Sequence, residues 1–204
     1  MSTSLRPLGY CYEMTEDMRD KRSFYVADRT DWAYNERQFN HPDPILDWPP
    51  DFTVYVKGEN QEDYLPAGLH MRIFSDKAKV ALRSCGLLGQ TEFLPVRMVH
   101  ADTGADIGRY WAVHVLTELL ALDRIHTRWM PGYVPPAERP PGRQGELETL
   151  HIMKPALVRE VARLADIFRL KESPTEMFVS TRFRRCLEQA GAATGIKFDP
   201  IPAY

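Results

Sequence analysis

The fold is decided by the stretch Ser75-Asp-Lys-Ala-Lys-Val-Ala-Leu-Arg-Ser-Cys-Gly86 and the residues that follow it to Val96, because the same pattern returns later in the chain. Residues 180–201 match residues 75–96 at a constant offset of 105 without a gap. The matching pairs are Ser75 and Ser180, Lys79 and Arg184, Leu82 and Leu187, Gly86 and Gly191, Phe93 and Phe198, Pro95 and Pro200, and Val96 and Ile201. Self-similarity at a fixed offset is typical of one supersecondary unit used twice.

Each copy has the pattern of a helix followed by a strand. The serine is a preferred N-cap, and the glycine ends the helix because it tolerates the left-handed conformation. Apolar residues lie at i, i+3, i+4 and i+7: Ala78, Ala81, Leu82 and Cys85, then Phe183, Cys186, Leu187 and Ala190. We predict helices over 75–85 and 180–190 that each bury one narrow face, with Cys85 and Cys186 as inert core residues. Chance, convergence on a common helix pattern and gene duplication can each produce such a repeat, and the ungapped offset favours duplication.

The rest of the chain reads as short strands separated by turns. Strands are predicted at 24–27, 52–56, 69–74, 92–99, 149–153, 167–170, 176–179 and 196–201, a helix at 156–164, and a strand followed by a helical turn in 110–122. Prolines exclude regular structure from 40–50 and 131–142. We therefore predict a single α+β domain over 1–204, with a mixed or antiparallel sheet, helices packed on one side and two related strand-helix-strand units.

Acidic and aromatic residues are concentrated before the repeated part. Residues 1–65 carry 13 acidic and 7 basic side chains, whereas residues 66–204 carry 15 and 19. The first segment also holds 11 of the 22 aromatic residues. We therefore divide the domain into an acidic, aromatic-rich N-terminal segment (1–65) and a duplicated α+β body (66–204).

This composition suits a surface that binds another protein, since aromatic anchors supply affinity and complementary charge steers the encounter. We predict that residues 28–64 form much of a surface for a basic protein partner. The candidate contact residues are Asp31, Trp32, Tyr34, Glu36, Trp48 and Tyr64. The alternative is that these aromatics close the core over a small sheet.

The overall composition argues against several other partners. A formal net charge of −2 gives no reason to expect nucleic acid or an anionic membrane as a partner. The longest apolar stretch, 111–122, is too short to span a bilayer, and the first residues lack the apolar region of a secretory signal. Three widely spaced cysteines indicate neither a disulfide framework nor a zinc site. We expect a cytoplasmic protein with reduced thiols.

No pattern of catalytic residues is found. The sequence contains no HExxH, GxSxG, GxGxxG or phosphate-binding GK[ST] loop. His114 and Glu118 would share a helix face, but no third metal ligand lies nearby. The arginines at 182, 184 and 185 suggest an anion patch, for which a solvated helix face is the simpler explanation. We expect no enzyme activity, metal or cofactor, and the weakest alternative is an enzyme that uses His100 with Asp102.

The second half of the chain resembles a bacterial family of uncharacterised domains that is grouped with immunity proteins of polymorphic toxin systems, known from myxobacteria and other proteobacteria. The resemblance is carried by Tyr110–Leu116 running to Asp123, Asp166–Glu172, Phe178–Gly191 and Thr194–Pro200. It covers about 95 residues, and 69–99 looks like an earlier counterpart of the last block. Residues 1–65 show no resemblance.

The resemblance implies binding of a partner protein in the cytoplasm, and it carries over no catalytic residues. The first hypothesis is a non-enzymatic immunity-type protein that binds and neutralises a cognate toxin. The alternative is a cytoplasmic regulatory protein that binds an endogenous signalling or proteolytic partner. A toxin gene next to this one favours the first hypothesis, and an unrelated cellular protein recovered as the partner favours the second.

Overall fold

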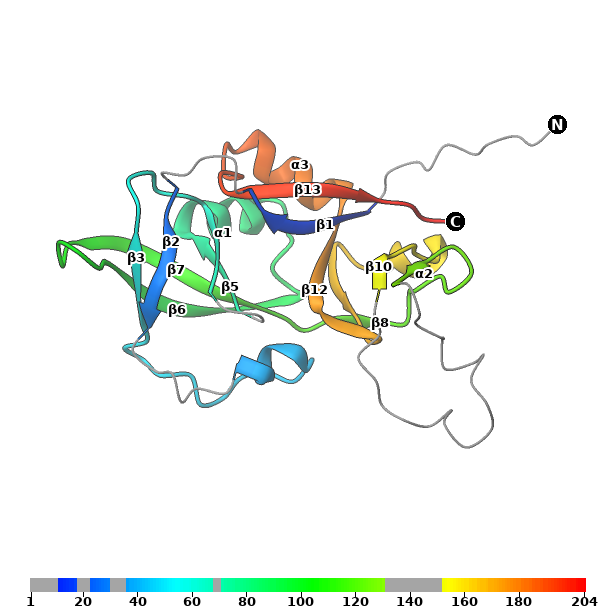
Figure 1. The fold of residues 1–204 in the computed structure, drawn as a ribbon, viewed down its shortest axis with the longest axis horizontal. Coiled ribbons are helices and arrows are strands. Elements are labelled where there is room, and N and C mark those ends of the chain that lie inside the picture. The colour runs from blue at the N-terminus through cyan, green and yellow to red at the C-terminus, as the bar shows by residue number, and fades with distance from the viewer. Residues whose placement is uncertain (1–10, 18–22, 30–35, 68–70, 131–151) are drawn as a thin grey trace.

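The computed structural model describes residues 11–17, 23–29, 36–67, 71–130 and 152–204 (Figure 1). These residues are mostly in strands, with few helices. The helical elements among them are η1 (Glu36–Asn40, a 3-10 helix), α1 (Asp76–Ser84), α2 (Arg159–Ala162) and α3 (Thr181–Gln189). None of the helices in these ranges is both long and apolar enough to cross a membrane.

A six-stranded sheet curls into a near-barrel. Its strands, in spatial order, are β2 (Tyr25–Arg29), β3 (Thr53–Lys57), β6 (Thr91–His100), β7 (Asp106–Val115), β5 (Arg72–Ser75) and β4 (Tyr64–Pro66). All neighbours are antiparallel except β3 and β6. The edge strands β2 and β4 contact each other. Alternate residues of the strands, among them Val54, Ile73 and Met98, fill the enclosed core.

A second sheet has five strands and a smaller core of its own. Its strands, in spatial order, are β13 (Ile196–Ile201), β1 (Cys11–Glu16), β12 (Ser173–Ser180), β11 (Ile167–Leu170) and β8 (Glu118–Leu119). Phe168, Phe178 and Leu157 are fully buried in the core on one face of this sheet. A separate pair, β9 (Arg128–Trp129) and β10 (Ile152–Lys154), lies beside it.

The two sheets contain the same four-stranded unit. The first unit has the order β4-β5-β7-β6 and the second has β11-β12-β1-β13. Ser75 and Val96 both pair with Tyr110 of the central strand, and their equivalents Ser180 and Ile201 both pair with Cys11. The offset of 105 therefore applies to the strand pairing as well. The central strand differs in origin, because β7 follows β6 in the chain whereas β1 comes from the N-terminal end of the described residues.

The helices α1 and α3 begin and end as predicted. The side chain of Ser75 accepts the backbone N–H of Ala78 at 3.1 Å, and that of Ser180 accepts the N–H of Phe183 at 3.1 Å. Gly86 and Gly191 follow the helices with φ of 70° and 60°. These positive angles explain the glycines, since other residues are strained there.

The same polar contacts recur at both helices, one within each unit and one between the two units. Each cap serine donates to an aspartate, Ser75 to Asp63 at 2.6 Å and Ser180 to Asp166 at 2.5 Å. The side chains at the second helical position, Lys77 and Arg182, each reach a carbonyl at the end of the opposite helix, those of Gly191 and Cys85.

Figure 1 shows α1 and α3 next to each other. Both helices share one apolar core with strands of both sheets, represented by Val113 from one and Val179 from the other. The predicted mixture of sheet and helix is therefore found, whereas packing of the helices on one side of a single sheet is not confirmed.

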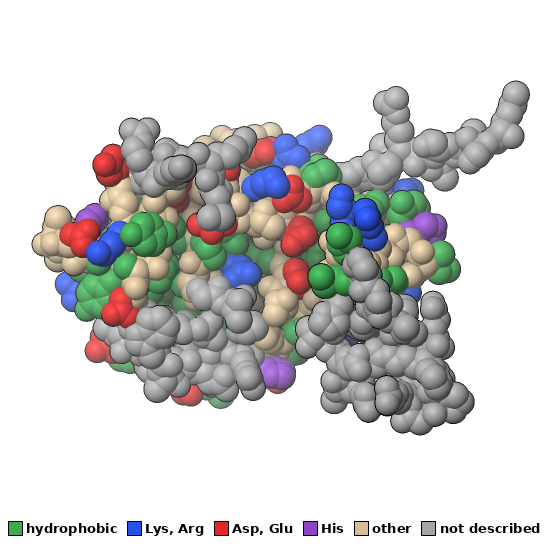
Figure 2. Space-filling view, in the orientation of Figure 1, with side chains coloured by type: hydrophobic (Ala, Val, Ile, Leu, Met, Phe, Trp, Pro, Cys, Tyr) green, Lys and Arg blue, Asp and Glu red, His purple; other side chains and the backbone are tan. Residues whose placement is uncertain are grey.

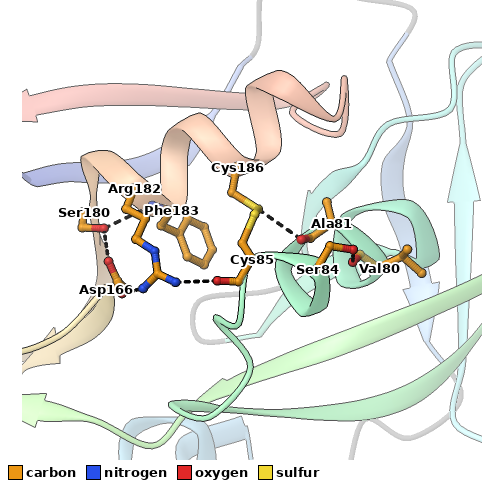
Figure 3. Close-up of a disulfide and its surroundings, with 9 residues drawn as sticks. All are labelled: Val80, Ala81, Ser84, Cys85, Asp166, Ser180, Arg182, Phe183 and Cys186. Carbon is orange, nitrogen blue, oxygen red and sulfur yellow. Dashed lines mark hydrogen bonds and ion pairs between the residues drawn. A yellow bond between two sulfur atoms is a disulfide. The ribbon is translucent and has the colours of Figure 1, made fainter.

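A disulfide joins the two helices, which corrects the prediction of reduced, inert thiols at these positions. Cys85 and Cys186 are bonded, with Cα atoms 6.4 Å apart, where the C-terminal end of α1 meets α3 (Figure 3). The narrow apolar faces that contain them pack against each other. The sequence separation of 101 residues gave no sign of this proximity. Cys11 is a buried free thiol, and burial raises its pKa to about 11.

The helical turn predicted after the strand in 110–122 is absent. The chain continues extended beyond Val115, where the N–H of Leu116 donates to Gln90 O and Thr117 O accepts the N–H of Arg169. Pairing with two other segments outweighs the local helical periodicity. His114 and Glu118 therefore do not share a helix face, and His114 instead faces Glu92.

Candidate functional site

The structure describes only part of the predicted partner surface. Asp31, Trp32 and Tyr34 lie outside the described residues, and of Glu36 only the backbone, at the start of η1, is described. Tyr64 is 2% exposed. It belongs to the core around α1 and α3, so the prediction that its side chain contacts a partner is corrected.

Trp48 helps to close the near-barrel. It lies in residues 36–52, here called the strap, and its ring packs against those of Phe39 and Phe52. Its Nε1 donates to Pro95 O at 2.8 Å. Phe39, Ile45 and Phe52 belong to the near-barrel core. Trp48 is half-buried, so this residue serves at least the core-closing role that the sequence left as an alternative.

A buried polar cluster holds the strap in place. His114 is fully buried, with Nε2 2.6 Å from His41 O and Nδ1 3.2 Å from Glu92 Oε2. The same Glu92 oxygen accepts the N–H of Ile45 at 3.0 Å, and Arg169 donates to His41 O at 2.8 Å. Burial lowers the pKa of Arg169 to about 10. Because this cluster satisfies backbone groups of the strap, its role is structural.

A groove lies between the second sheet and the β9–β10 pair. It has a volume of about 520 Å³ and continues into a smaller pocket of about 70 Å³. Glu13, Met153 and Pro155 line both parts. The further lining residues of the larger part are His126, Arg128, Lys154, Lys197, Asp199, Pro200, Ile201 and Pro202, and those of the smaller part are Ile152, Leu170, Ser173, Glu176 and Phe178.

Carboxylates from three adjacent strands face this groove: Glu13 of β1, Glu176 of β12 and Asp199 of β13. Asp199 is neutralised, because Lys197 Nζ lies 2.7 Å away and Thr15 donates to it at 3.0 Å, and these partners lower its pKa. Figure 2 shows acidic side chains over β1 and β12, with basic side chains beside them toward β10.

Glu13 has a different environment from Asp199. Burial raises the pKa of Glu13, and the charges of Glu176 and Asp199 raise it further. Within the described ranges no hydrogen bond or ion pair reaches the Glu13 carboxylate, although Lys197 exerts a weaker electrostatic effect on it. Glu176 accepts a hydrogen bond from Ser173. The floor of the groove therefore holds a carboxylate that forms no hydrogen bond or ion pair with the described residues, and a cationic group would stabilise its charge.

The other polar residues that the sequence singled out do not converge on this groove. His100 and Asp102 lie at the exposed β6–β7 turn, where Lys57 pairs with Asp102 at 2.9 Å. Arg182 pairs with Asp166 at 2.8 Å, and Arg184 pairs with Glu188 at 2.7 Å, so both arginines form ion pairs within the protein. Nowhere in the described part of the chain do three or more His, Cys, Asp or Glu side chains gather as a metal site.

The sequence analysis missed the three carboxylates of the groove. It predicted no strand over Cys11–Glu16, so Glu13 was not placed in a sheet. A signal was nevertheless present, because Glu176 and Asp199 stand 105 residues after Met71 and Leu94. Applying the offset of 105 to residues outside the predicted helices aligns two acidic residues with positions that are apolar in the first copy.

The family described as "Immunity protein family (Imm11)" matches residues 10–203. No curated protein matches the chain. The resemblance seen in the second half is confirmed, and the match extends through the N-terminal segment for which the sequence showed none. From residue 10 to residue 203 this chain belongs to the Imm11 immunity protein family.

Proposed function

We propose that this protein binds a cognate protein toxin and neutralises it by forming a stable complex. The observation that carries the proposal is the family match over residues 10–203, which includes both four-stranded units and the strap. Neutralisation by complex formation needs complementary surfaces rather than bond-making groups. The groove, in which the Glu13 carboxylate forms no hydrogen bond or ion pair with the described residues, supplies one surface suited to a partner with basic side chains.

Co-expression tests this proposal. Each protein encoded by a gene that flanks this one is expressed in a bacterial host with and without this chain, and the growth of the cultures is followed. We expect growth to be restored, and the two purified proteins to elute together from a sizing column. Growth arrest in the presence of well-expressed, folded protein would contradict the proposal, as would a toxin that elutes separately.

We further propose that the protein acts in the cytoplasm, where a producing cell meets its own toxin. Disulfides are rare in that reducing compartment, so the bond between Cys85 and Cys186 makes a direct measurement of localisation necessary. Cells that express the full chain are separated into cytoplasmic, periplasmic and membrane fractions, and we expect the protein to follow a cytoplasmic marker. Recovery with a periplasmic or membrane marker would overturn the assignment.

A further inference from the structure

The groove lies on the second four-stranded unit, at a position where the first unit has buried apolar side chains. Because Tyr110 corresponds to Cys11, Ala112 corresponds to Glu13 in the central strand. The offset of 105 also relates Leu94 to Asp199 and Met71 to Glu176. In the first unit Ala112, Leu94 and Met71 are all buried in the near-barrel core. In the second unit the three equivalent residues are carboxylates that line the groove.

In the first unit the strap contributes to the same core, because Phe39, Ile45 and Phe52 cluster there with Ala112, Leu94 and Met71. It is fixed at two points on β6: the N–H of Ile45 donates to Glu92 at 3.0 Å, and Trp48 donates to Pro95 O at 2.8 Å. The residues equivalent to Glu92 and Pro95 are Lys197 and Pro200, and both line the groove. The first unit thus shows that residues 41–52 of the strap, which follow η1 and form no helix or strand, bind to this place on the fold.

The side chains of the groove indicate which segment would bind there. Met153 is exposed and Ile152 is half-buried, so these two residues supply apolar contacts, whereas Leu170 and Phe178 behind them are fully buried in the core. Glu13 and Glu176 supply negative charge, whereas Asp199 is already paired with Lys197. On the opposite wall Arg128 and Lys154 are basic, so the groove selects a cation at its floor and disfavours a uniformly basic segment.

We propose that the groove between the second sheet and the β9–β10 pair binds an extended segment of the partner toxin, with an arginine or lysine side chain inserted between Glu13 and Glu176 and apolar residues beside it. This inference rests on the proposed function for the identity of the partner. The cation would pair with the half-buried Glu13 carboxylate, which forms no ion pair with the described residues, and such a contact contributes strongly when it is desolvated. The strap in the first unit is the internal model for the bound segment.

A peptide titration tests the site without the toxin. The probes are a capped five-residue peptide with a central arginine between two leucines and the same peptide with glutamine in place of arginine. Each is added to the ¹⁵N-labelled full chain, and amide shifts are recorded. We expect the arginine peptide to shift signals of β1, β12 and β13 and to bind at least about fivefold more tightly than the glutamine peptide, as loss of a charged hydrogen bond implies.

The variant Glu13→Gln/Glu176→Gln should reduce this preference to less than about twofold, because the isosteric amides remove only the charge. Asp106→Asn, which removes an exposed carboxylate of β7 that pairs with Arg97, is the matched control and should leave it unchanged. The assignment is wrong if the arginine peptide does not bind, if both peptides bind equally, or if the shifts fall outside the groove.

The toxin complex separates this inference from the proposed function. We expect Glu13→Gln/Glu176→Gln to weaken binding of the co-purified toxin by at least about tenfold relative to Asp106→Asn. Equal affinities would reject the groove as the docking site and leave the immunity function intact. A wild-type chain that binds no toxin would reject the function, while the peptide titration would still decide whether the groove binds a cation.

Discussion

Equivalent positions of the two units carry side chains that differ in polarity, burial and binding partner. Ala112 is fully buried and apolar in the first unit, and its equivalent Glu13 is a carboxylate on the floor of a groove. At another position Glu92 binds the strap in the first unit, while its equivalent Lys197 neutralises Asp199 in the second. The backbone pairing is the same in both cases. Side-chain identity therefore decides whether this place becomes a filled core or an open groove.

The raised pKa of Glu13 predicts a pH-dependent cost to stability. A carboxyl whose pKa is higher in the folded state stabilises the fold at pH values below its ordinary value of 4.5, and this contribution is lost as the pH rises through the folded-state pKa. Glu13→Gln should therefore raise the free energy of unfolding relative to wild type at pH 7. The difference should shrink as the pH falls below 4.5.

Urea denaturation at pH 7 and at pH 3.5 measures this difference. Glu160→Gln is the control, because the side chain of Glu160 is 81% exposed and its replacement should change little at either pH. A Glu13→Gln protein that is less stable than wild type at pH 7 would show that the folded chain compensates the Glu13 charge.

At the scale of elements, α1 and α3 are the connection between the two units. Each helix is capped by a serine whose hydroxyl is bonded to an aspartate, and each sends a basic side chain to the opposite helix. Lys79 lies over Phe93 and Trp111, and Arg184 lies over the equivalent Phe198 and Tyr12. The disulfide adds a covalent link between the same helices, as Figure 3 shows. The interface is therefore held by apolar, polar and covalent contacts together.

The disulfide should contribute to stability mainly by restricting the unfolded chain. Replacing both residues, Cys85→Ser/Cys186→Ser, should lower the free energy of unfolding by about 2–4 kcal/mol under non-reducing conditions, because the bond closes a long loop. Chemical denaturation with and without reductant measures this. Under reducing conditions the difference between wild type and variant should largely disappear.

Thiol counting provides the control for this prediction. The unfolded, unreduced protein should show one reactive thiol, that of Cys11, and the reduced protein should show three. In the native protein at pH 8 Cys11 should react slowly, since it is buried and its pKa is about 11. Three reactive thiols before reduction would mean that the helices are not covalently joined.

For the whole molecule, the notable feature is that the N-terminal β1 completes the C-terminal unit. It lies between β12 and β13, where β7 lies between β5 and β6 in the first unit. Ile201 near the chain end pairs with Cys11 at the start of β1, so the two ends of the described chain meet in one sheet. The two units therefore have similar strand orders but different connections. In the first unit β6 is followed directly by β7, whereas in the second unit the equivalent strands β13 and β1 lie near opposite ends of the described chain.

This arrangement predicts that the chain tolerates circular permutation. Residue 204 is joined to residue 11 by a flexible linker of about ten residues, and new ends are opened in the exposed β6–β7 turn, residues 101–105. The permuted protein should keep its circular dichroism spectrum, with a melting temperature within about 5 °C of the wild type, because loop closure costs little at this length. A permutant opened beside the buried Ala112 in β7 is the control and should not fold.

The sequence by itself determined the repeated helices, their caps and several strands, because these follow from residues close together in the chain. Ser180, Gly191 and β13 lie where their local patterns predicted. The sequence also determined the family resemblance, which the match over residues 10–203 confirms. Localisation and the contacts predicted at Asp31, Trp32 and Tyr34 stay predictions.

The tertiary structure alone decided which distant segments meet. It brought Cys85 to Cys186, buried Tyr64, and placed β1 between two strands from the other end of the chain. Pairing over such separations depends on the packing of whole sheets, which no local periodicity records. The groove exists for the same reason, since Glu13 and Glu176 are 163 residues apart in the sequence and face one cavity only after the strands have paired.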